Sequence, residues 1–433
     1  MKIGILGHVG HHNLGDEALI AAVIQNVRRR YPEAELHGFT VYPHDTEQRH
    51  RIPAFPLRRM NGGPAGIPQP QLAAHPPGHW RSASAGAWRA LRARLKRLAF
   101  LRVLVQAVRR LGRAVLAVPL EVPFLVKSYR RLRGTDLLLV AGSGQLNDYW
   151  GGPWGFPFTL FKWSLLARAT GTKVAFLSLG AGPLRTRLGK FFIKRTLRLA
   201  HYRSYRDVDA RQCVLELGLP GEHPVIPDLV FSLPCDDVPP DAVRARPRTV
   251  GINPMPVFDD GYWPESDPEL YGRYIRILAS FADWLVVSGY RVRLFATQLR
   301  VDPGAINQIR ALMREGATAD RISSFDELIA LIDSLDLVVP MRYHGTLFGL
   351  IRCKPVLSIF WQRKSEELMR QMGQAEYAID VRRLTLETLQ ERFLALQGHT
   401  AEFTAAVRHR LPAVRQALQT QYDSAFALLQ AVS

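Results

Sequence analysis

Two patterns alternate along the chain, short continuous apolar runs and longer stretches with helical spacing. The run KIGILG at residues 2–7 predicts a buried strand. The apolar residues of the next segment have the three- and four-residue spacing of a helix: Leu19, Ile20, Val23, Ile24 and Val27. Further strands are predicted at 35–42, 137–141, 173–177 and 201–207, with helices between the later ones. Such an alternation predicts parallel βαβ units and a sheet covered on both faces.

A second alternation begins after a Pro- and Asp-rich segment at 232–247, which is typical of a linker. Its strands are predicted at 248–254, 291–298, 336–341 and 356–360, and its helices at 269–289 and 303–315. We therefore expect an α/β protein with two Rossmann-like domains that face each other across a cleft. The expected divisions are an N-terminal domain at 1–231 with a basic helical insertion at about 53–134, the linker, a C-terminal domain at 248–395, and C-terminal helices at 396–433.

The positive charge of the chain is concentrated in one segment. The 433 residues include 57 Lys and Arg against 38 Asp and Glu, a net charge of +19, which indicates an anionic partner. Residues 81–134 hold 14 of the basic residues and one acid, so they carry +13. A helical apolar stripe at 91–108 predicts a basic amphipathic helix there, either docked on an anionic membrane surface or exposing a solvated face.

The composition also bears on location. Cys213, Cys235 and Cys353 lie far apart and have no metal-ligand spacing, which is typical of reduced thiols in a cytoplasmic protein. The first residues lack the zones of a signal peptide, and charged residues interrupt the apolar stretch 98–126. We expect a cytoplasmic protein, soluble or bound to the inner face of the cell membrane.

The first loop offers little for a cofactor. Gly4, Gly7 and Gly10 do not have the dinucleotide spacing, and no acidic residue ends the second strand, so a nicotinamide site is not expected. The loop histidines, His8 among them, have no second cluster that would complete a metal site. We therefore expect no cofactor and no metal.

Three loops at strand ends are candidates for binding. Asn13, Asp16 and Glu17 lie at the start of the first helix and are expected to face the cleft, although Asp16 could instead cap the helix. Small-residue turns follow two later strands, at 142–144 and 178–183. In a parallel sheet these loops meet at one edge, where ligands bind.

The most specific cluster of candidate site residues lies in the second half of the chain. Arg342 and His344 directly follow the strand 336–341 and open a helix, and Lys364 follows the next strand. An arginine can clamp a phosphate or carboxylate, and a histidine can donate a proton. The alternative is a core histidine beside an exposed arginine.

These residues resemble a known family. GDEAL at 15–19, SLGAGP at 178–183, YRD at 205–207, PD at 227–228 and above all the block from Ser324 to Lys364 are similar to the polysaccharide pyruvyl transferases. The resemblance implies a GT-B-like fold and transfer of the pyruvyl group from phosphoenolpyruvate to a sugar as a ketal. The implied acceptor is a sugar of a polysaccharide or a lipid-linked oligosaccharide.

The resemblance also implies roles for single residues. His344 and Arg342 match the R-x-H signature and would be catalytic, while Arg206 and Lys364 would contact the donor. The remaining implied substrate-binding residues are Asn13, Asp16, Glu17, Gly142, Gly144 and Gly180. The chain departs from the family pattern in three places: a serine interrupts the glycine triplet at 142–144, FWQR precedes Lys364, and the basic insertion has no counterpart.

Two other functions stay open. A GT-B glycosyltransferase would use a nucleotide sugar in place of phosphoenolpyruvate, and a noncatalytic protein would use its basic segment to bind a membrane. Nucleic acid is not an expected partner, because the sequence has no recognition helix, zinc finger or basic sheet interleaved with aromatic residues.

Overall fold

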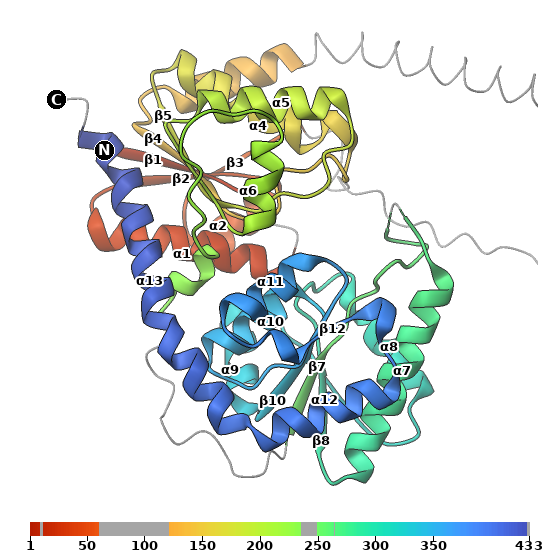
Figure 1. Cartoon of the computed structure of the whole chain (residues 1–433). Coiled ribbons are helices and arrows are strands. Elements are labelled where there is room, and N and C mark those ends of the chain that lie inside the picture. The colour runs from red at the N-terminus through yellow and green to blue at the C-terminus, as the bar shows by residue number, and fades with distance from the viewer. Residues whose placement is uncertain (9–11, 60–120, 235–248, 264, 431–433) are drawn as a thin grey trace, which may run out of the picture. The chain divides into compact units, whose positions relative to one another are not determined.

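The computed structural model describes residues 1–8, 12–59, 121–234, 249–263 and 265–430 (Figure 1). The chain divides into two compact units, one made of Met1–Arg58 with Gly134–Ser433 and the other of Arg59–Arg133. The predicted amphipathic helix at 91–108 and most of the basic segment lie outside the described residues. In the second unit, residues 121–132 are helical. All elements below belong to the first unit.

The first sheet has six parallel strands in the described part of the chain, in the order β3-β2-β1-β4-β5-β6. They are β1 (Lys2–Leu6), β2 (Glu35–Thr40), β3 (Ala54–Pro56), β4 (Leu137–Ala141), β5 (Lys173–Leu179) and β6 (Tyr202–Tyr205). The connecting helices are α1 (Leu14–Arg30), α2 (Pro43–His50), α4 (Phe156–Ala169), α5 (Arg187–Leu199) and α6 (Val208–Leu215). The strand order is that of a Rossmann sheet.

The two faces of this sheet are packed by different helices. Side chains that alternate along a strand point to opposite faces, and Ile3 and Ile5 belong to the core cluster that α1 completes. On the other face, Trp163 of α4 packs on Phe39 of β2, with ring centroids 4.6 Å apart. Because an added Cβ on Gly4 would come within 2.9 Å of Phe39, the small residue in β1 makes room for that aromatic pair.

The second sheet repeats this plan with four parallel strands among the described residues, in the order β10-β7-β8-β9. They are β7 (Thr249–Asn253), β8 (Arg291–Phe295), β9 (Thr318–Asp320) and β10 (Leu337–Pro340). Its helices are α7 (Pro268–Val287), α8 (Asp302–Leu312), α9 (Phe325–Ser334) and α10 (Tyr343–Ile351). Residue Val356 pairs with Val338 of β10, and a two-stranded sheet of β11 (Ser358–Phe360) and β12 (Ala378–Asp380) follows. The remaining helices are α11 (Arg363–Gln371), α12 (Leu386–Gly398) and α13 (Thr400–Gln430).

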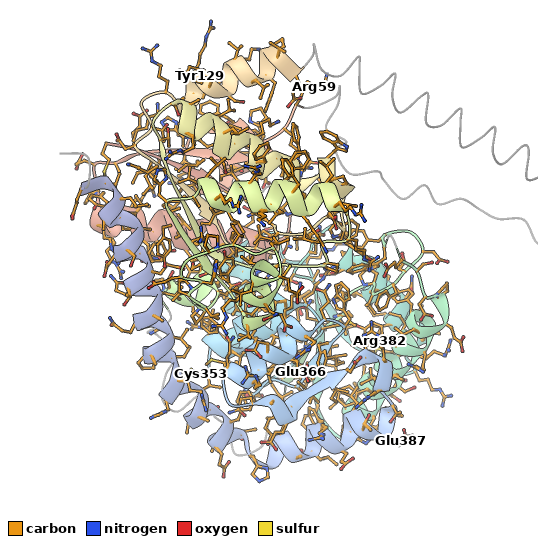
Figure 2. The ribbon with its side chains drawn as sticks, turned by 45° about the horizontal axis from the view of Figure 1, so that its top comes forward. Arg59, Tyr129, Cys353, Glu366, Arg382 and Glu387 are labelled. Atoms are coloured by element: carbon orange, nitrogen blue, oxygen red, sulfur yellow. The ribbon has the colours of Figure 1, made fainter. Side chains whose placement is uncertain are left out.

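The last helix, α13, packs on both halves (Figure 1). Near its start, Thr404 donates a hydrogen bond to the carbonyl of Cys353, which is labelled in Figure 2. Near its end, the buried Gln421 side chain bonds the hydroxyls of Ser178 on β5 and Ser204 on β6. The helix therefore joins the two sheets with polar contacts as well as apolar ones.

The expected α/β class with two parallel Rossmann-like sheets is confirmed. One detail was wrong: residues 54–56, which were predicted as the start of the basic helical insertion, form the edge strand β3, because Ala54 and Leu57 are buried despite their Pro-rich surroundings. Helix α2 and strands β9 and β12 were not predicted. Most of the predicted linker, residues 235–247, lies outside the described residues. In the described part of the chain, no helix is both long and apolar enough to cross a bilayer.

Candidate active site

The site lies at the point where the strand order reverses in each sheet. In the first sheet β1 neighbours β4, and in the second β7 neighbours β10. Loops that leave such neighbouring strands run in opposite directions and expose their backbone at the carboxyl edge. The loops that follow β1, β4 and β10 carry Asn13, Ser143 and Arg342, and Asn253 is the last residue of β7.

A short stretch of backbone pairing joins the loop after β1 to the segment after β8, beside this edge. Asn13 forms an antiparallel bridge with Gln298, Leu14 donates to the carbonyl of Thr297, and Leu299 donates to the carbonyl of His12. The start of α1 is thereby fixed to the segment that follows β8. The loops at the carboxyl edge of the first sheet are consequently held next to those of the second sheet.

Asn13 and Asp16 form the start of α1. The Asn13 carboxamide oxygen accepts from the Gly15 amide at 3.1 Å, so Asn13 caps the helix and the alternative in which Asp16 is the cap is wrong. The Asn13 amide donates to Asp16 at 2.8 Å, and the Ser143 hydroxyl donates to the other Asp16 oxygen at 3.1 Å. His8 Nδ1 lies 3.6 Å from Asp16. The buried Asp16 carboxylate is thus held by three groups.

The turn at 142–144 bends sharply beside Asp16. Gly142 and Ser143 both have positive φ angles, of 29° and 63°. A glycine would adopt the second of these without strain, but the serine hydroxyl is needed for the bond to Asp16. An added Cβ on Gly144 would meet nothing within 4 Å, so this residue leaves open space.

Arg342 is positioned by a buried carboxylate. Its Nε donates to Asp302 at 2.9 Å and its Nη2 donates to the same oxygen. The second Asp302 oxygen accepts from the amides of Thr297 and Gln298 at 3.1 and 2.8 Å. Burial lowers the pKa of Arg342, but the neighbouring carboxylate outweighs it, so the pKa lies above its ordinary value and the guanidinium stays charged.

Arg206 and Lys364 lie on the same aromatic ring. The guanidinium of Arg206 is 4.4 Å, and the Lys364 ammonium 5.8 Å, from the centroid of the Tyr343 ring. Arg206 is 4% exposed and pairs with Asp207 at 3.3 Å and Asp228 at 3.5 Å. Its pKa is lowered by burial and raised more strongly by its charged neighbours, to a value above the ordinary one.

Lys364 has no carboxylate within 4.0 Å among the residues that the structure describes. It is the second residue of α11, the helix that also carries Glu366 (Figure 2). Burial, together with the positive charge of Arg206, lowers the pKa of Lys364 to about 8. Lys364 is therefore a cation whose charge is incompletely balanced by the protein.

His344 lies between the two halves of the site. An added Cβ on Gly15 would overlap the Nδ1 and Cγ atoms of the His344 ring, so the ring packs directly on the backbone at the start of α1. The Nε2 atom is buried and has no hydrogen-bond partner in the described part of the chain. Burial lowers the pKa of His344, so the ring is neutral at pH 7.

Gly180 makes room for Arg206. An added Cβ on Gly180 would come within 2.6 Å of Nη2 of Arg206. Its amide also donates to the carbonyl of Ser143 at 2.9 Å, which ties the loop after β5 to the loop after β4. Close approach of neighbouring side chains therefore explains Gly142 and Gly180 but not Gly144.

The structure brings most of the predicted residues together but not all of them. His344, Arg342, Arg206, Lys364, Asn13 and Asp16 lie around one point between the sheets, whereas Glu17 does not join them. The Glu17 carboxylate is buried against His50 at the end of α2, 2.9 Å away. Consecutive residues of a helix point about 100° apart, so Glu17 is directed toward His50 while Asp16 is directed toward Asn13 and Ser143.

A sequence profile of the family described as polysaccharide pyruvyl transferase matches residues 13–362. The chain belongs to the polysaccharide pyruvyl transferase family. The expectation from its motifs is confirmed. A search of curated protein sequences gave no match.

Solved structures similar to this pyruvyl transferase share its fold. A glycosyltransferase from Rickettsia africae ESF-5 has a TM-score of 0.54 at 9% identity, over 99% of this chain and 98% of that one. The UDP-GlcNAc 2-epimerase from Neisseria meningitidis bound to UDP-GlcNAc has a TM-score of 0.53 at 10% identity, over 98% and 99% of the two chains. At such identities the likeness concerns the fold alone. The expected GT-B-like fold is confirmed.

Sequence reasoning missed the carboxylates that position the cations of the site, and it missed His8 as a neighbour of Asp16. Asp302 lies at the start of α8, 40 residues before the arginine that it binds, and no local pattern connects the two. Asp228 lies in the PD motif at 227–228, which was noted without a role. Among the described residues, no group of three or more His, Cys, Asp or Glu side chains is arranged to hold a metal ion.

We expect Gly15→Ala to displace the His344 ring and to lower turnover by about 100-fold, because a misplacement of roughly 1 Å in an active-site group has that effect. Product mass measured over time gives the rate. Gly304→Ala on α8 is the matched control, because an added Cβ there meets nothing within 4 Å. Wild-type turnover of Gly15→Ala would show that the ring position is unimportant.

Proposed function

We propose that this pyruvyl transferase moves the pyruvyl group of phosphoenolpyruvate to a sugar of a polysaccharide or lipid-linked oligosaccharide and forms a ketal. The observation that supports the proposal is the arrangement of three cations, Arg206, Arg342 and Lys364, around the neutral His344. Phosphoenolpyruvate carries a carboxylate and a phosphate on adjacent atoms, so a site for it needs more than one cationic group.

The cations differ in ways that suit the two anions. Each arginine is held by a carboxylate that leaves other N–H groups of its fork for a ligand, and a planar fork matches a carboxylate or phosphate. Lys364 lacks such a partner in the described part of the chain, and a dianionic phosphate would balance its charge. In this arrangement the anions of the donor replace water around groups that are already oriented.

The proposed reaction has an addition and then a substitution at C2 of the donor. A sugar hydroxyl adds to C2 and gives its proton to a basic group of the protein, while C3 receives a proton from His344, which turns the methylene group into a methyl group. A second hydroxyl then adds to C2 as the bond from C2 to the phosphate oxygen breaks, and phosphate leaves with the proton of that hydroxyl. The products are a pyruvyl ketal and inorganic phosphate.

His344 becomes an acid only when the donor is bound. Burial keeps the ring neutral in the free protein. The negative charges of phosphoenolpyruvate favour the protonated ring and raise its pKa. The His344 ring is therefore protonated when the donor is bound and can give its proton to C3, whereas the ring is neutral while the site is empty.

His8 and Asp16 are the groups that we assign to the sugar hydroxyl. His8 lies 3.6 Å from Asp16, whose carboxylate is fixed by Asn13 and Ser143. A histidine beside a buried carboxylate can be held by it in a defined orientation, as a general base requires. Because the pair belongs to the first sheet and His344 to the second, acceptor and donor would be activated from opposite halves.

The proposal is tested with phosphoenolpyruvate and a lipid-linked oligosaccharide, by following phosphate release and the mass of the acceptor. We expect His344→Ala and Arg342→Ala to lower both signals by roughly 100-fold or more, because they remove the proton donor and a fixed charge. Arg370→Ala on α11, an exposed arginine paired only with Glu367 nearby, is the control.

Donor identity is read from thermal shifts with phosphoenolpyruvate and with nucleoside diphosphates. Only the true donor stabilises the fold by mass action. If a nucleoside diphosphate raises Tm and phosphoenolpyruvate does not, the protein is a nucleotide-sugar glycosyltransferase and the proposal is wrong. Undiminished turnover of His344→Ala would contradict the assignment of that residue.

The affinity for phosphoenolpyruvate is expected to fall as pH rises through about 8. A lysine with a lowered pKa is charged below that pH and neutral above it, so the anion loses a partner. Titration calorimetry from pH 7 to 9.5 should show Kd rising roughly tenfold, the equivalent of about 1.4 kcal/mol. Lys364→Arg should weaken the pH dependence while it keeps tight binding, and the dependence that remains reports the proton that His344 takes up with the donor. An unchanged dependence in that variant would assign the titration to another group.

We expect His8→Gln and Asp16→Asn to lower kcat by about 10²- to 10⁴-fold, the usual contribution of a general base. Their Kd for phosphoenolpyruvate should change little, because the cations of the donor site remain. The double variant should be no slower than the worse single variant if the two residues act as a unit. Normal kcat in either variant would place the base elsewhere.

A further inference from the structure

Helices α4 and α5 cover the side of the first sheet opposite α1, and their outer surface is unusually apolar. Along α4 and the turn before it, Trp154, Phe158, Phe161 and Leu165 recur at three- and four-residue intervals. The exposed fractions are 63% for Trp154 and 44% for Leu165, and on α5 they are 38% for Leu188 and 47% for Phe191. These six residues are called the α4/α5 face below.

Ring contacts make the α4/α5 face continuous. Trp154 lies 5.1 Å from Phe158, and Phe161 of α4 lies 6.4 Å from Phe191 of α5, between ring centroids. Beneath them, Phe192 stacks on Phe161 at 5.4 Å and is buried. The exposed rings therefore rest on a packed layer and form a surface larger than single exposed side chains would.

Basic residues are interleaved with these rings. Helix α5 carries Arg187, Lys190, Lys194, Arg195 and Arg198 and no acidic residue. Arg195 lies over the Phe191 ring at 5.3 Å. The whole segment 149–206 contains 11 Lys and Arg and not one Asp or Glu.

We infer that the α4/α5 face binds the surface of an anionic bilayer. Exposed Trp, Phe and Leu beside Lys and Arg, on helices that lie flat against their own domain, are the features of an interfacial membrane contact. Protein interfaces favour aromatic residues as well but are depleted in Lys. The positive charge of the face complements acidic lipid headgroups, with each basic residue near the surface adding to the attraction.

The basic insertion is a poor alternative occupant of the α4/α5 face. Residues 81–134 carry +13, and the segment 149–206 carries +11. Two surfaces of such charge repel each other. The chain leaves the first unit at Arg58, whose guanidinium lies 4.5 Å from the ring of Phe156 on α4.

The α4/α5 face begins at the edge of the sheet that carries the active site. Asp148, in the loop after β4, accepts from the amides of Arg185 and Thr186 at 2.9 and 2.8 Å. This pairing holds the start of α5 beside the loop that contains Ser143. A sugar linked to a membrane lipid would thus be presented near that edge, a step that rests on the function proposed above.

The test is sedimentation of the full-length protein with vesicles of phosphatidylcholine alone and with 30% phosphatidylglycerol. We expect binding to the anionic vesicles only. Leu188→Ser with Phe191→Ser should weaken it at least tenfold through lost apolar contact, and Lys190→Gln with Arg195→Gln about 30-fold through lost charge. The two variants address the two components of the contact separately.

Matched controls come from another part of the surface. Leu312→Ser with Leu394→Ser removes two residues that are 51% and 53% exposed, and Arg310→Gln with Arg314→Gln removes two exposed charges. Both controls should bind like the wild type. The inference is overturned if the wild type binds neither vesicle, or if the α5 variants bind as tightly as the controls.

Light scattering separates a membrane contact from contact between copies of the chain. If the wild type is a dimer that Leu188→Ser with Phe191→Ser converts to a monomer and no vesicle binding is seen, the face is a protein interface and the inference is wrong. Vesicle binding needs neither donor nor acceptor, so its outcome is independent of the proposed chemistry. With a soluble acceptor, the α5 variants should keep wild-type turnover.

Discussion

The packing of the His344 ring on Gly15 governs the geometry of the whole site. One residue follows a strand of the second sheet and the other opens the first helix of the first sheet, 329 positions earlier. Any side chain at position 15 would overlap the ring, so the approach of the two loops depends on a residue without a Cβ. The bridge between Asn13 and Gln298 holds the same two segments together through their backbones. Groups from both sheets, His344 and Asp16, are therefore held close to one another.

Pairing with carboxylates divides the cations of the site into two kinds. Arg342 and Arg206 each bind acidic residues in surroundings from which water is largely excluded, and this fixes both their charge and their direction. A buried pair of this kind contributes little net stability, because removing two charges from water is costly. The pairing instead fixes the direction in which each guanidinium group points. Lys364 lacks such a pair in the described part of the chain, so its charge depends on pH and on the ligand.

The two-sheet fold and the basic residues of the site could be predicted from the sequence, but the carboxylates that position those residues could not. Arg342 and His344 were identifiable because a buried strand ends directly before them and parallel strands end at one edge. Asp302 and Asp228 were not, because an acidic residue that binds a distant arginine looks like any helix cap. The contact between Glu17 and His50 was also not predicted, because neighbouring helix positions point in different directions and no sequence pattern marks His50 as a partner of Glu17. The edge strand β3 was hidden by prolines on both sides of Phe55.

The net charge of +19 comes from two segments of the chain and not from the basic residues of the site, which have acidic partners. Residues 81–134 and 149–206 together carry +24, so the other 321 residues carry −5. Arg206 belongs to the second segment, but Arg342 and Lys364 belong to the acidic remainder, where Asp302 balances one of them. The donor site therefore accounts for almost none of the excess. A charge of this size, gathered in two segments and mixed on α5 with exposed rings, acts at long range on a large anionic surface, whereas a small anion needs only a few oriented groups. In the two proposals made above, the chain separates these tasks, with catalysis between the sheets and attraction on the outside of one of them.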